Sequence, residues 1–444
     1  MKPIVRGSSL FDVEQVAKDA LPDIVYREVP TGLSPMEAAR NFDKTVAFNT
    51  RSPPAWAHLA RAGFSYSLKP SGLLFAAART FNFDRLDDIH QFDFKSDPLT
   101  GCRWPQKRYG HSLDVAAVAN LLAHHNAAAL SAADRRALVL AALLHDILMP
   151  PGGETVKHID MERFDEDSNF PAFVESETFW RFACEHDVDP QAVARIMREE
   201  DAPGVLKDLA DKIGYVCRDV EHLVSGQDAL ADGKIGSYMR IRNLLNRCPQ
   251  PGSFWASVTI EQGQVVIHDV DTFGAFLELR ALLFANIYQS PSTRTNDYVY
   301  NEVILRWLYE TGQLKAPNLL KMTDEDLDRI VDQYVDWTQE ESVERLRFST
   351  LQEAQRVQRD WLERGVVFST VVDYSRSCKP ATHFLVPTPS GPQPFAQAYP
   401  AQAERIVDIT THASGVLLFY IREPKARFRV GLLSQLTEHR RKTT

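Results

Sequence analysis

The sequence predicts a mainly α-helical protein with a small β-hairpin insertion and a small α+β subdomain at its C-terminal end. Three observations support this prediction. Apolar residues recur at helical spacing, for example at Val115, Val118, Leu121 and Leu122. The segment 136–144 is apolar all round, which is typical of a helix buried at the centre of a bundle. Strand-like patterns are confined to one hairpin and to the chain after about residue 364.

The helices are expected in the following order. The first long helix covers residues 114–125. The run Ser131-Ala132-Ala133-Asp134 has the form of a helix start, so the buried helix follows it and reaches Leu144. Further helices are expected at 171–187, 189–199, 203–223, 236–247, 272–290, 295–313 and 323–363.

The strands are expected in two regions. Residues 254–260 and 265–270 flank a Glu-Gln-Gly-Gln turn and predict a hairpin. Near the C-terminal end, the strand-like runs 366–368 and 416–421 are separated by the turn-rich segment 387–394. We therefore expect three parts: an N-terminal helical segment at 1–80, a core at 81–335, and a C-terminal helix with a small α+β subdomain at 336–444.

Composition excludes several classes of protein. The chain has 444 residues, of which 44% are hydrophobic and 25% are charged, so it is not wholly disordered. Lys and Arg number 50 against 59 Asp and Glu, which argues against a general polyanion binder, so nucleic acid is not indicated as a partner. The longest apolar run, 137–144, is too short to span a bilayer, and no secretory signal is visible. We therefore expect no membrane partner. The five cysteines are scattered, which favours a cytoplasmic location.

The strongest candidate for a functional site is His145-Asp146, which directly follows the buried helix. An unpaired ionised group at such a place is costly. A bound cation would remove this cost, because imidazole and carboxylate together suit a catalytic divalent metal. The alternative interpretation is a helix end that reaches solvent.

Two further residues are placed to join this pair. His111 lies at the start of the preceding long helix, and two antiparallel helices joined by a short loop bring the start of one near the end of the next. His111 can then face His145 and Asp146. A fourth ligand must come from elsewhere, and Asp211 is the best-placed candidate.

At these residues the sequence resembles the HD-domain metal-dependent phosphohydrolases, whose motif is H…HD…D on a bundle of helices. More narrowly, it resembles the deoxynucleoside triphosphate triphosphohydrolases, the group that includes the enzyme with fused SAM and HD domains. The resemblance covers roughly residues 80–335. Five blocks carry it: F-x-R-L-x-x-I-x-Q at 83–91, R-x-x-H-S-x-x-V at 108–115, the apolar-HD segment at 142–146, D-K-x-x-Y-x-x-R-D at 211–219, and R-x7-Y-Q at 280–289.

The resemblance implies a role for each matching residue. The metal ligands would be His111, His145, Asp146 and Asp211, and such a set can accept Mn, Fe, Co, Mg, Ni or Zn. Positive charge for a triphosphate would come from Arg108, Lys212 and Arg280. The sugar would be contacted by Tyr215, Asp219 and Gln91, and the sugar and base by Tyr288 and Gln289.

The sequence departs from these hydrolases after the HD pair. They usually continue G-H-x-P-F-x-H and so supply histidines for proton transfer, whereas Met149 and Glu154 stand at those two positions here. A thioether cannot transfer a proton. Glu154 is the candidate general acid if burial raises its pKa, and a solvated loop glutamate is the alternative. The acidic run 165–167 lies nearby and is expected to be solvated.

We therefore expect a metal-dependent phosphohydrolase that converts a dNTP into a deoxynucleoside and triphosphate. One alternative is a catalytically impaired HD-domain sensor that binds nucleotides without hydrolysing them. A second is an HD phosphohydrolase acting on another nucleoside phosphate or on a phosphodiester. The resemblance also implies a homo-oligomer.

Overall fold

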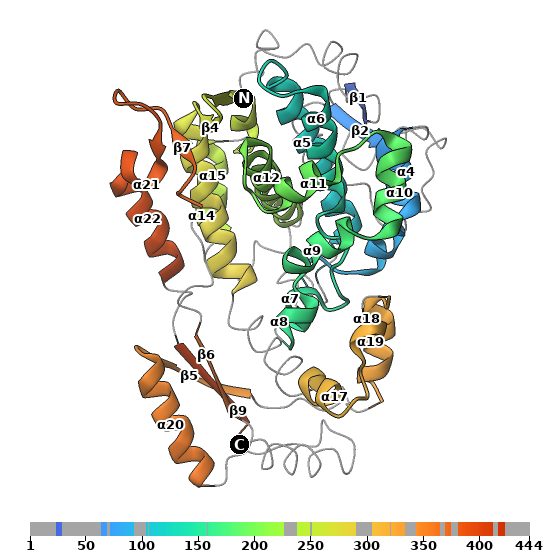
Figure 1. Ribbon diagram of the computed structural model, residues 1–444. Helices are drawn as coiled ribbons and strands as arrows, with labels where there is room; N and C mark the ends of the chain where they lie inside the picture. The colour runs from blue at the N-terminus through green and yellow to red at the C-terminus, as the bar shows by residue number, and fades with distance from the viewer. Residues whose placement is uncertain are drawn as a thin grey trace.

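The computed structural model describes residues 24–28, 64–68, 72–92, 104, 106–157, 159–225, 238–248, 251–289, 304–319, 321–333, 343–364, 369–373, 381–411 and 416–421. Across these residues the protein is mainly helical with small sheets, as the sequence predicts (Figure 1). No helix among them is long and apolar enough to cross a membrane.

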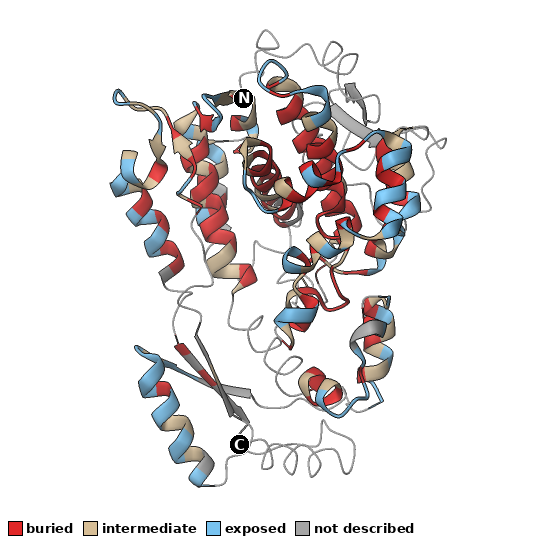
Figure 2. Cartoon of the chain, in the orientation of Figure 1, coloured by how far each residue is buried: buried red, intermediate tan, exposed pale blue. Residues whose placement is uncertain are grey.

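Three helices form the centre of the molecule: α5 (Arg108–His125), α6 (Ala132–Leu144) and α12 (Ala202–Ser225). Each packs against the other two. The Ser131 side chain caps α6 by accepting a hydrogen bond from the Asp134 amide, and every residue from Ala137 to Leu144 is buried. The predicted central helix is therefore confirmed, and Figure 2 shows this buried centre in red.

A close approach of α5 and α12 depends on small residues. A side chain at Gly214 would meet Val115 Cγ2 at 3.2 Å, so glycine lets the two backbones come together. The same helices are joined by an ion pair at 2.8 Å between Arg218 and Asp114, which is fully buried. These contacts fix how α12 lies against the start of α5.

Smaller helices cover one side of this centre. They are α4 (Leu73–Thr80), the 3-10 helix η2 (Phe83–Asp88), α7 (Gly153–Lys157), α8 (Met161–Phe164), α9 (Glu166–Val174), α10 (Glu177–His186) and α11 (Pro190–Met197). The single helix expected at 171–187 is wrong. The chain breaks near Ser176, whose side chain accepts from the Phe179 amide and starts a new helix.

The predicted hairpin exists but is shorter than expected. Strands β3 (Val258–Glu261) and β4 (Gln264–Ile267) pair antiparallel, and a 3-10 helix, η3 (Ser253–Ser257), occupies the place of the expected first residues. Gln262 and Gly263 make the turn with positive φ angles of 50° and 81°. Strand β7 (Leu385–Val386) joins β4 in parallel, and β8 (Gln393–Pro394) joins β7.

The other side of the centre holds α14 (Tyr238–Arg247), α15 (Val270–Leu283) and the π-helix η4 (Phe284–Tyr288). Helices α21 (Phe395–Ala398) and α22 (Pro400–Thr411) lie beside them, with α22 packed on α15. The Phe273 ring of α15 meets Phe384 and Phe395 with centroids 6.0 and 5.5 Å apart. Part of the expected C-terminal subdomain is thus packed on the helical body.

The remaining C-terminal elements form a separate small sheet. Strand β9 (Val416–Ile421) lies between β5 (Val343–Phe348) and β6 (Ser369–Asp373), and α20 (Leu351–Glu363) packs against them. The helix expected at 323–363 is wrong, because α19 (Asp324–Val331), β5 and α20 share that range. Charged and apolar residues alternate from Arg345 to Phe348, which is a strand pattern.

Several expectations fall on the edges of the described regions. Strands β1 (Ile24–Glu28) and β2 (Phe64–Leu68) pair antiparallel, so a wholly helical segment at 1–80 is wrong. Of the helix expected at 295–313, residues 295–303 lie outside the described residues, as does the strand-like run 366–368. Short helices α17 (Arg306–Glu310) and α18 (Ala316–Leu319) follow. The domain boundaries stay predictions.

Candidate metal centre and nucleotide site

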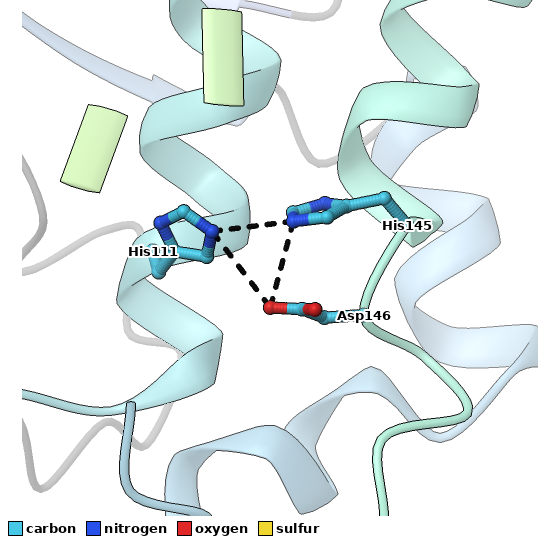
Figure 3. Close-up of side chains that lie close together, drawn as sticks. All are labelled: His111, His145 and Asp146. Carbon is cyan, nitrogen blue, oxygen red and sulfur yellow. Dashed lines mark hydrogen bonds and ion pairs between the residues drawn. The ribbon is translucent and has the colours of Figure 1, made fainter. Parts of the chain in front are cut away.

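The four predicted metal ligands converge where α5, α6 and α12 meet. His111 lies in the first turn of α5, and Asp211 lies in the middle of α12. His145 and Asp146 directly follow the last residue of α6. Figure 3 shows His111, His145 and Asp146 pointing toward one another from α5 and from the end of α6.

The distances between the donor atoms suit a shared cation. The two histidine Nε2 atoms are 3.2 Å apart, and His111 Nε2 is 3.0 Å from Asp211 Oδ1. Asp146 Oδ2 lies 3.5 Å from His145 Nε2 and 3.8 Å from His111 Nε2. Two ligands at right angles and about 2.1 Å from one ion are about 3.0 Å apart. The observed separations therefore leave room for one ion.

The His145 ring is oriented for metal binding by its other nitrogen. Nδ1 lies 2.8 Å from the backbone oxygen of Ala142, so it holds the proton and donates it to that carbonyl. The lone pair of Nε2 is then free to face the cluster. Metal-ligating histidines are commonly fixed in this way.

Charges around the cluster keep its carboxylates ionised. Burial alone would raise the pKa of Asp146, but the Arg108 guanidinium and the two histidines lower it to about 2. Arg108 Nη1 lies 3.0 and 3.2 Å from the two Asp146 oxygens. Burial opposes ionisation of Asp211 too, yet the hydrogen bond from His111 and nearby positive charges hold its pKa well below the ordinary range. Both groups are in the form that binds cations.

The residues present fit a divalent cation. Burial lowers the pKa of His111 more than the neighbouring carboxylates raise it, so its imidazole is neutral. Two imidazoles and two carboxylates lie together here, and His111 Nδ1 has no hydrogen-bond partner among the described residues. Such a donor set matches the ligands of catalytic divalent metals.

Two of the predicted sugar-contacting residues follow Asp211 along one face of α12. Tyr215 and Asp219 come one and two turns after it. Each is already paired across the gap to α15 and η4: Arg280 Nε donates to the Tyr215 hydroxyl at 2.5 Å, and the Tyr288 hydroxyl donates to Asp219 at 2.5 Å. The structure therefore brings these four predicted residues together beside the metal ligands.

The two predicted glutamines lie at the edge of the same region. Gln91 is buried, and the next residue, Phe92, packs its ring against Tyr288 with centroids 4.6 Å apart. Gln289 ends η4, with its backbone amide donating to the Phe284 carbonyl. Gln289 therefore directly follows Tyr288, and Gln91 precedes the residue that contacts Tyr288. Their contacts with a nucleotide stay predictions.

Lys212 has a different environment from the other predicted phosphate-binding residues. Its ammonium pairs with Asp208 and lies 5.6 Å from the centroid of the Phe384 ring. Phe384 adjoins the hairpin sheet rather than the metal ligands. Neither of these contacts, made among the described residues, joins Lys212 to the metal ligands.

Glu154 belongs to a group of charges that the sequence does not reveal. Its side chain is 46% exposed and pairs with Lys157 Nζ at 3.0 Å. Lys157 is buried and also bonds Glu166 at 2.8 Å. The expectation that residues 165–167 are a solvated loop is wrong for Glu166, which is 8% exposed in the first turn of α9. No sequence motif indicates this pairing, because it joins two helices.

Met149 stands at the position of one of the usual histidines. Its side chain is fully buried, and its backbone carbonyl accepts a hydrogen bond. Arg85 donates to the carbonyl oxygens of Met149 at 2.8 Å and Ile147 at 3.0 Å. Asp324 accepts from the Gly152 amide at 2.8 Å and from the His90 amide at 2.7 Å. The loop after the metal ligands is thus fastened to η2 and α19.

Comparisons with known proteins agree with this geometry. Residues 108–224, which contain all four predicted metal ligands, match the family model of the HD domain. No curated protein matches the chain significantly.

Two solved structures are similar to this chain in fold. A hypothetical protein from Aquifex aeolicus has a TM-score of 0.54 and 15% identity, covering 86% of this chain and 96% of its own. A phosphohydrolase from Bacteroides thetaiotaomicron has a TM-score of 0.54 and 14% identity, covering 81% of this chain and 98% of its own. At such low identity these likenesses concern the fold alone.

Proposed function

Because residues 108–224 form an HD domain, we propose that the protein is a metal-dependent phosphohydrolase that converts a dNTP into a deoxynucleoside and triphosphate. One observation carries the proposal: His111, His145 and Asp146 have donor atoms within 4.8 Å of one another, Asp211 Oδ1 lies 3.0 Å from His111 Nε2, and α12 presents Tyr215 and Asp219 directly beyond Asp211. The fold likeness to a protein described as a phosphohydrolase supports the same reaction class.

The chemistry of the site suits attack by water at phosphorus. A divalent cation bound here would polarise a phosphoryl oxygen and lower the pKa of water toward about 7. His111, His145, Asp146 and Asp211 would hold that cation. Arg108 and Arg280 offer planar guanidinium groups that suit bidentate contacts with phosphate oxygens.

The paired residues beyond the cluster suit a deoxyribose. A 3′-hydroxyl could replace the Tyr288 hydroxyl as the donor to Asp219, which is fully buried in this structure. The resemblance of the Tyr215 segment to dNTP hydrolases implies a tyrosine packed against C2′, where little space remains for a hydroxyl. We therefore propose that dNTPs bind better than NTPs, by about 1–3 kcal/mol.

The test is incubation of metal-loaded protein with each of the four dNTPs and chromatographic separation of the products. We expect deoxynucleoside and triphosphate in equal amounts, and no product from the variant carrying His145→Ala and Asp146→Ala. Release of phosphate or pyrophosphate instead would contradict cleavage at the α-phosphorus. Equal affinity for dATP and ATP in calorimetry would contradict the sugar preference.

A second candidate, a nucleotide sensor with an impaired active site, is favoured by one observation. The positions of the usual histidines hold a buried methionine and a glutamate that pairs with Lys157. If the metal-loaded protein binds dNTPs and leaves them intact, the sensor replaces the hydrolase.

A further inference from the structure

We propose that Arg218 is a positioning residue that holds His111 in place for the metal ion. This inference rests on the metal centre of the phosphohydrolase proposed above and deepens it. Arg218 belongs to the motif block at 211–219, but the resemblance gives it no role. Its guanidinium acts on His111 from α12, through the residues that lie on either side of that histidine in α5.

The first of these contacts is a buried ion pair. Arg218 Nε lies 2.8 Å from Asp114 Oδ2, and the two side chains are 8% and 0% exposed. Separating two charges inside a protein is costly, because water cannot replace either partner. The guanidinium is therefore fixed relative to the first turns of α5, where Asp114 comes three residues after His111.

The second contact is made with the backbone directly before His111. A Cβ atom at Gly110 would lie 2.3 Å from Arg218 Nη1 and 2.8 Å from Nη2, whereas ordinary contacts begin near 3.4 Å. The guanidinium thus occupies the space that a side chain at Gly110 would need. Gly110 and Asp114 are four residues apart on a helix and share one face, so a single planar group covers both.

This arrangement controls where His111 lies relative to the other metal ligands. Because Gly110 and His111 share a peptide bond, the guanidinium limits the position of the His111 backbone. Arg218 and Asp211 both belong to α12, so the arginine also fixes His111 relative to a ligand on the other helix. His111 Nε2 lies 3.0 Å from Asp211 Oδ1, and a functional site needs its groups held within about 0.5 Å of the productive geometry.

A role in helix packing alone would give a different result from a positioning role. A variant at Gly110 would then lose unfolding free energy but keep its metal ion, as a variant at any other crowded glycine would. Gly274 provides this comparison, because its Cβ atom would lie 2.1 Å from Gln402 Nε2. That contact joins α15 to α22, which contain none of the four predicted metal ligands.

The experiment measures Co²⁺ binding to the full chain through the visible absorption of the bound ion, which depends on coordination geometry. Gly110→Ala puts a methyl group where the guanidinium lies, and we expect it to lower the affinity about 10–100-fold and to change the absorption. Arg218→Lys keeps a positive charge for Asp114 but leaves the space against Gly110 empty. It should lower the affinity as well. Gly274→Ala should match the wild type in both measurements.

The variant that carries Gly110→Ala and Arg218→Lys together gives the sharpest comparison. Lysine has no Nη atoms, so the added methyl group can enter the space that the shorter side chain leaves. Neighbouring residues that share one space are not additive. We therefore expect the affinity and the absorption of the double variant to lie closer to wild type than those of either single variant.

Three results would overturn the proposal. They are wild-type Co²⁺ binding in both single variants, a double variant whose loss equals the two single losses combined, and an equal loss of affinity in Gly274→Ala. If Gly110→Ala does not fold, Arg218→Lys decides alone, and wild-type binding in it overturns the proposal. A wild type that binds no Co²⁺ removes the metal centre and the phosphohydrolase function with it, whereas unchanged variants of a dNTP-hydrolysing wild type remove only the positioning role.

Discussion

Arg108 shows how a single residue controls the charge of the metal centre. Its guanidinium lies against both oxygens of Asp146 and, with the two histidines, holds the pKa of that carboxyl at about 2. A proton and a metal ion compete for the same oxygens. Arg108 therefore favours the metal, even though its own positive charge lies close to the ion.

The first prediction concerns removal of this guanidinium. Arg108→Met should raise the pKa of Asp146, so that the bound metal is released at a higher pH than from the wild type. We expect the metal affinity near neutral pH to fall about 10–100-fold, as for other residues that support a ligand. Competition with a metal-binding dye measures both quantities. Arg181→Met, at an exposed site on α10, is the control, and an unchanged release profile in Arg108→Met would contradict the argument.

Asp219 gives a second prediction, from its effect on folding. Burial raises its pKa to about 8, against an ordinary value of 3.8, while the Tyr288 hydrogen bond and Arg218 oppose the rise. The folded protein therefore keeps a proton that the unfolded chain releases above about pH 4. The free energy of unfolding contributed by this group is fully present below that pH and is lost as the pH rises toward 8.

The corresponding experiment compares wild type with Asp219→Asn in urea at several pH values. Each unit of the pKa difference corresponds to about 1.4 kcal/mol. Asparagine cannot ionise, so the stability of the variant relative to wild type should increase from about pH 5 to about pH 8. A constant difference between the two proteins over this range would exclude a protonated Asp219 in the folded state.

Much of the candidate site could be predicted from the sequence, because its motifs occur along the chain in a recognisable order. His111, His145, Asp146 and Asp211 are visible in the sequence, and the structure brings them within a few ångströms of one another. The Lys157–Glu166 pair is not visible, since it depends on how α7 and α9 fold around one ammonium. The contacts of Lys212 with Asp208 and Phe384 are not visible in the sequence either, because a motif identifies a residue but not the direction of its side chain, and its phosphate-binding role stays a prediction.

At the scale of elements, α12 is the part on which the site depends most. It contributes Asp211 and the two residues beyond it, and it lies close to α5 because Gly214 has no side chain. Gly214→Leu should force the helices apart and cost about 1–3 kcal/mol of unfolding free energy.

Two measurements check this third prediction. Leucine is a better helix former than glycine, so a loss of stability in chemical unfolding would report the steric conflict with Val115. Metal affinity should fall as well, because His111 lies on α5 and Asp211 on α12. A variant as stable as wild type would show that the approach of the two helices is unimportant.

The fourth prediction concerns the attachment of α19 to the loop after the metal ligands. Asp324 is buried and accepts hydrogen bonds from Gly152 and from the amide and ring of His90. Asp324→Ala would remove the acceptor for these donors and should cost about 1–3 kcal/mol for each donor left unsatisfied.

The matched control is Glu325→Ala on the neighbouring residue. Glu325 pairs only at the surface with Arg329, and such pairs contribute about 0–1 kcal/mol. Chemical unfolding of both variants distinguishes the cases. Equal losses of unfolding free energy in Asp324→Ala and Glu325→Ala would mean that the buried hydrogen bonds of Asp324 stabilise the fold no more than the surface pair of Glu325.

Most helices could be predicted because periodicity is a local property, whereas strand pairing is not. Strands β1 and β2 are distant in sequence, so neither segment alone shows its partner. Strand β5 was hidden between two helices in what looked like one charged helical stretch. The range 171–187 contains parts of two helices, because Ser176 caps the start of α10. Hydrophobic periodicity alone does not reveal such a cap.

At the scale of the whole molecule, segments distant in sequence complete one helical body. Residues 381–411 pack on α15 and extend the hairpin sheet through β7, while α19 reaches the loop beside the metal ligands (Figure 1). The contacts of residues 381–411 with α15 and β4 cross the predicted boundary at residue 336. The helical body also encloses the centre where His111, His145, Asp146 and Asp211 lie together.

The most direct test of this account is elemental analysis of protein purified without added metal. We predict about one tightly held divalent metal ion for each wild-type chain, because the donor distances leave room for one ion. The variant carrying His145→Ala and Asp146→Ala should hold almost none, while Glu162→Gln, at an exposed position in α8, should match the wild type. Wild-type metal content in the double variant would contradict the account.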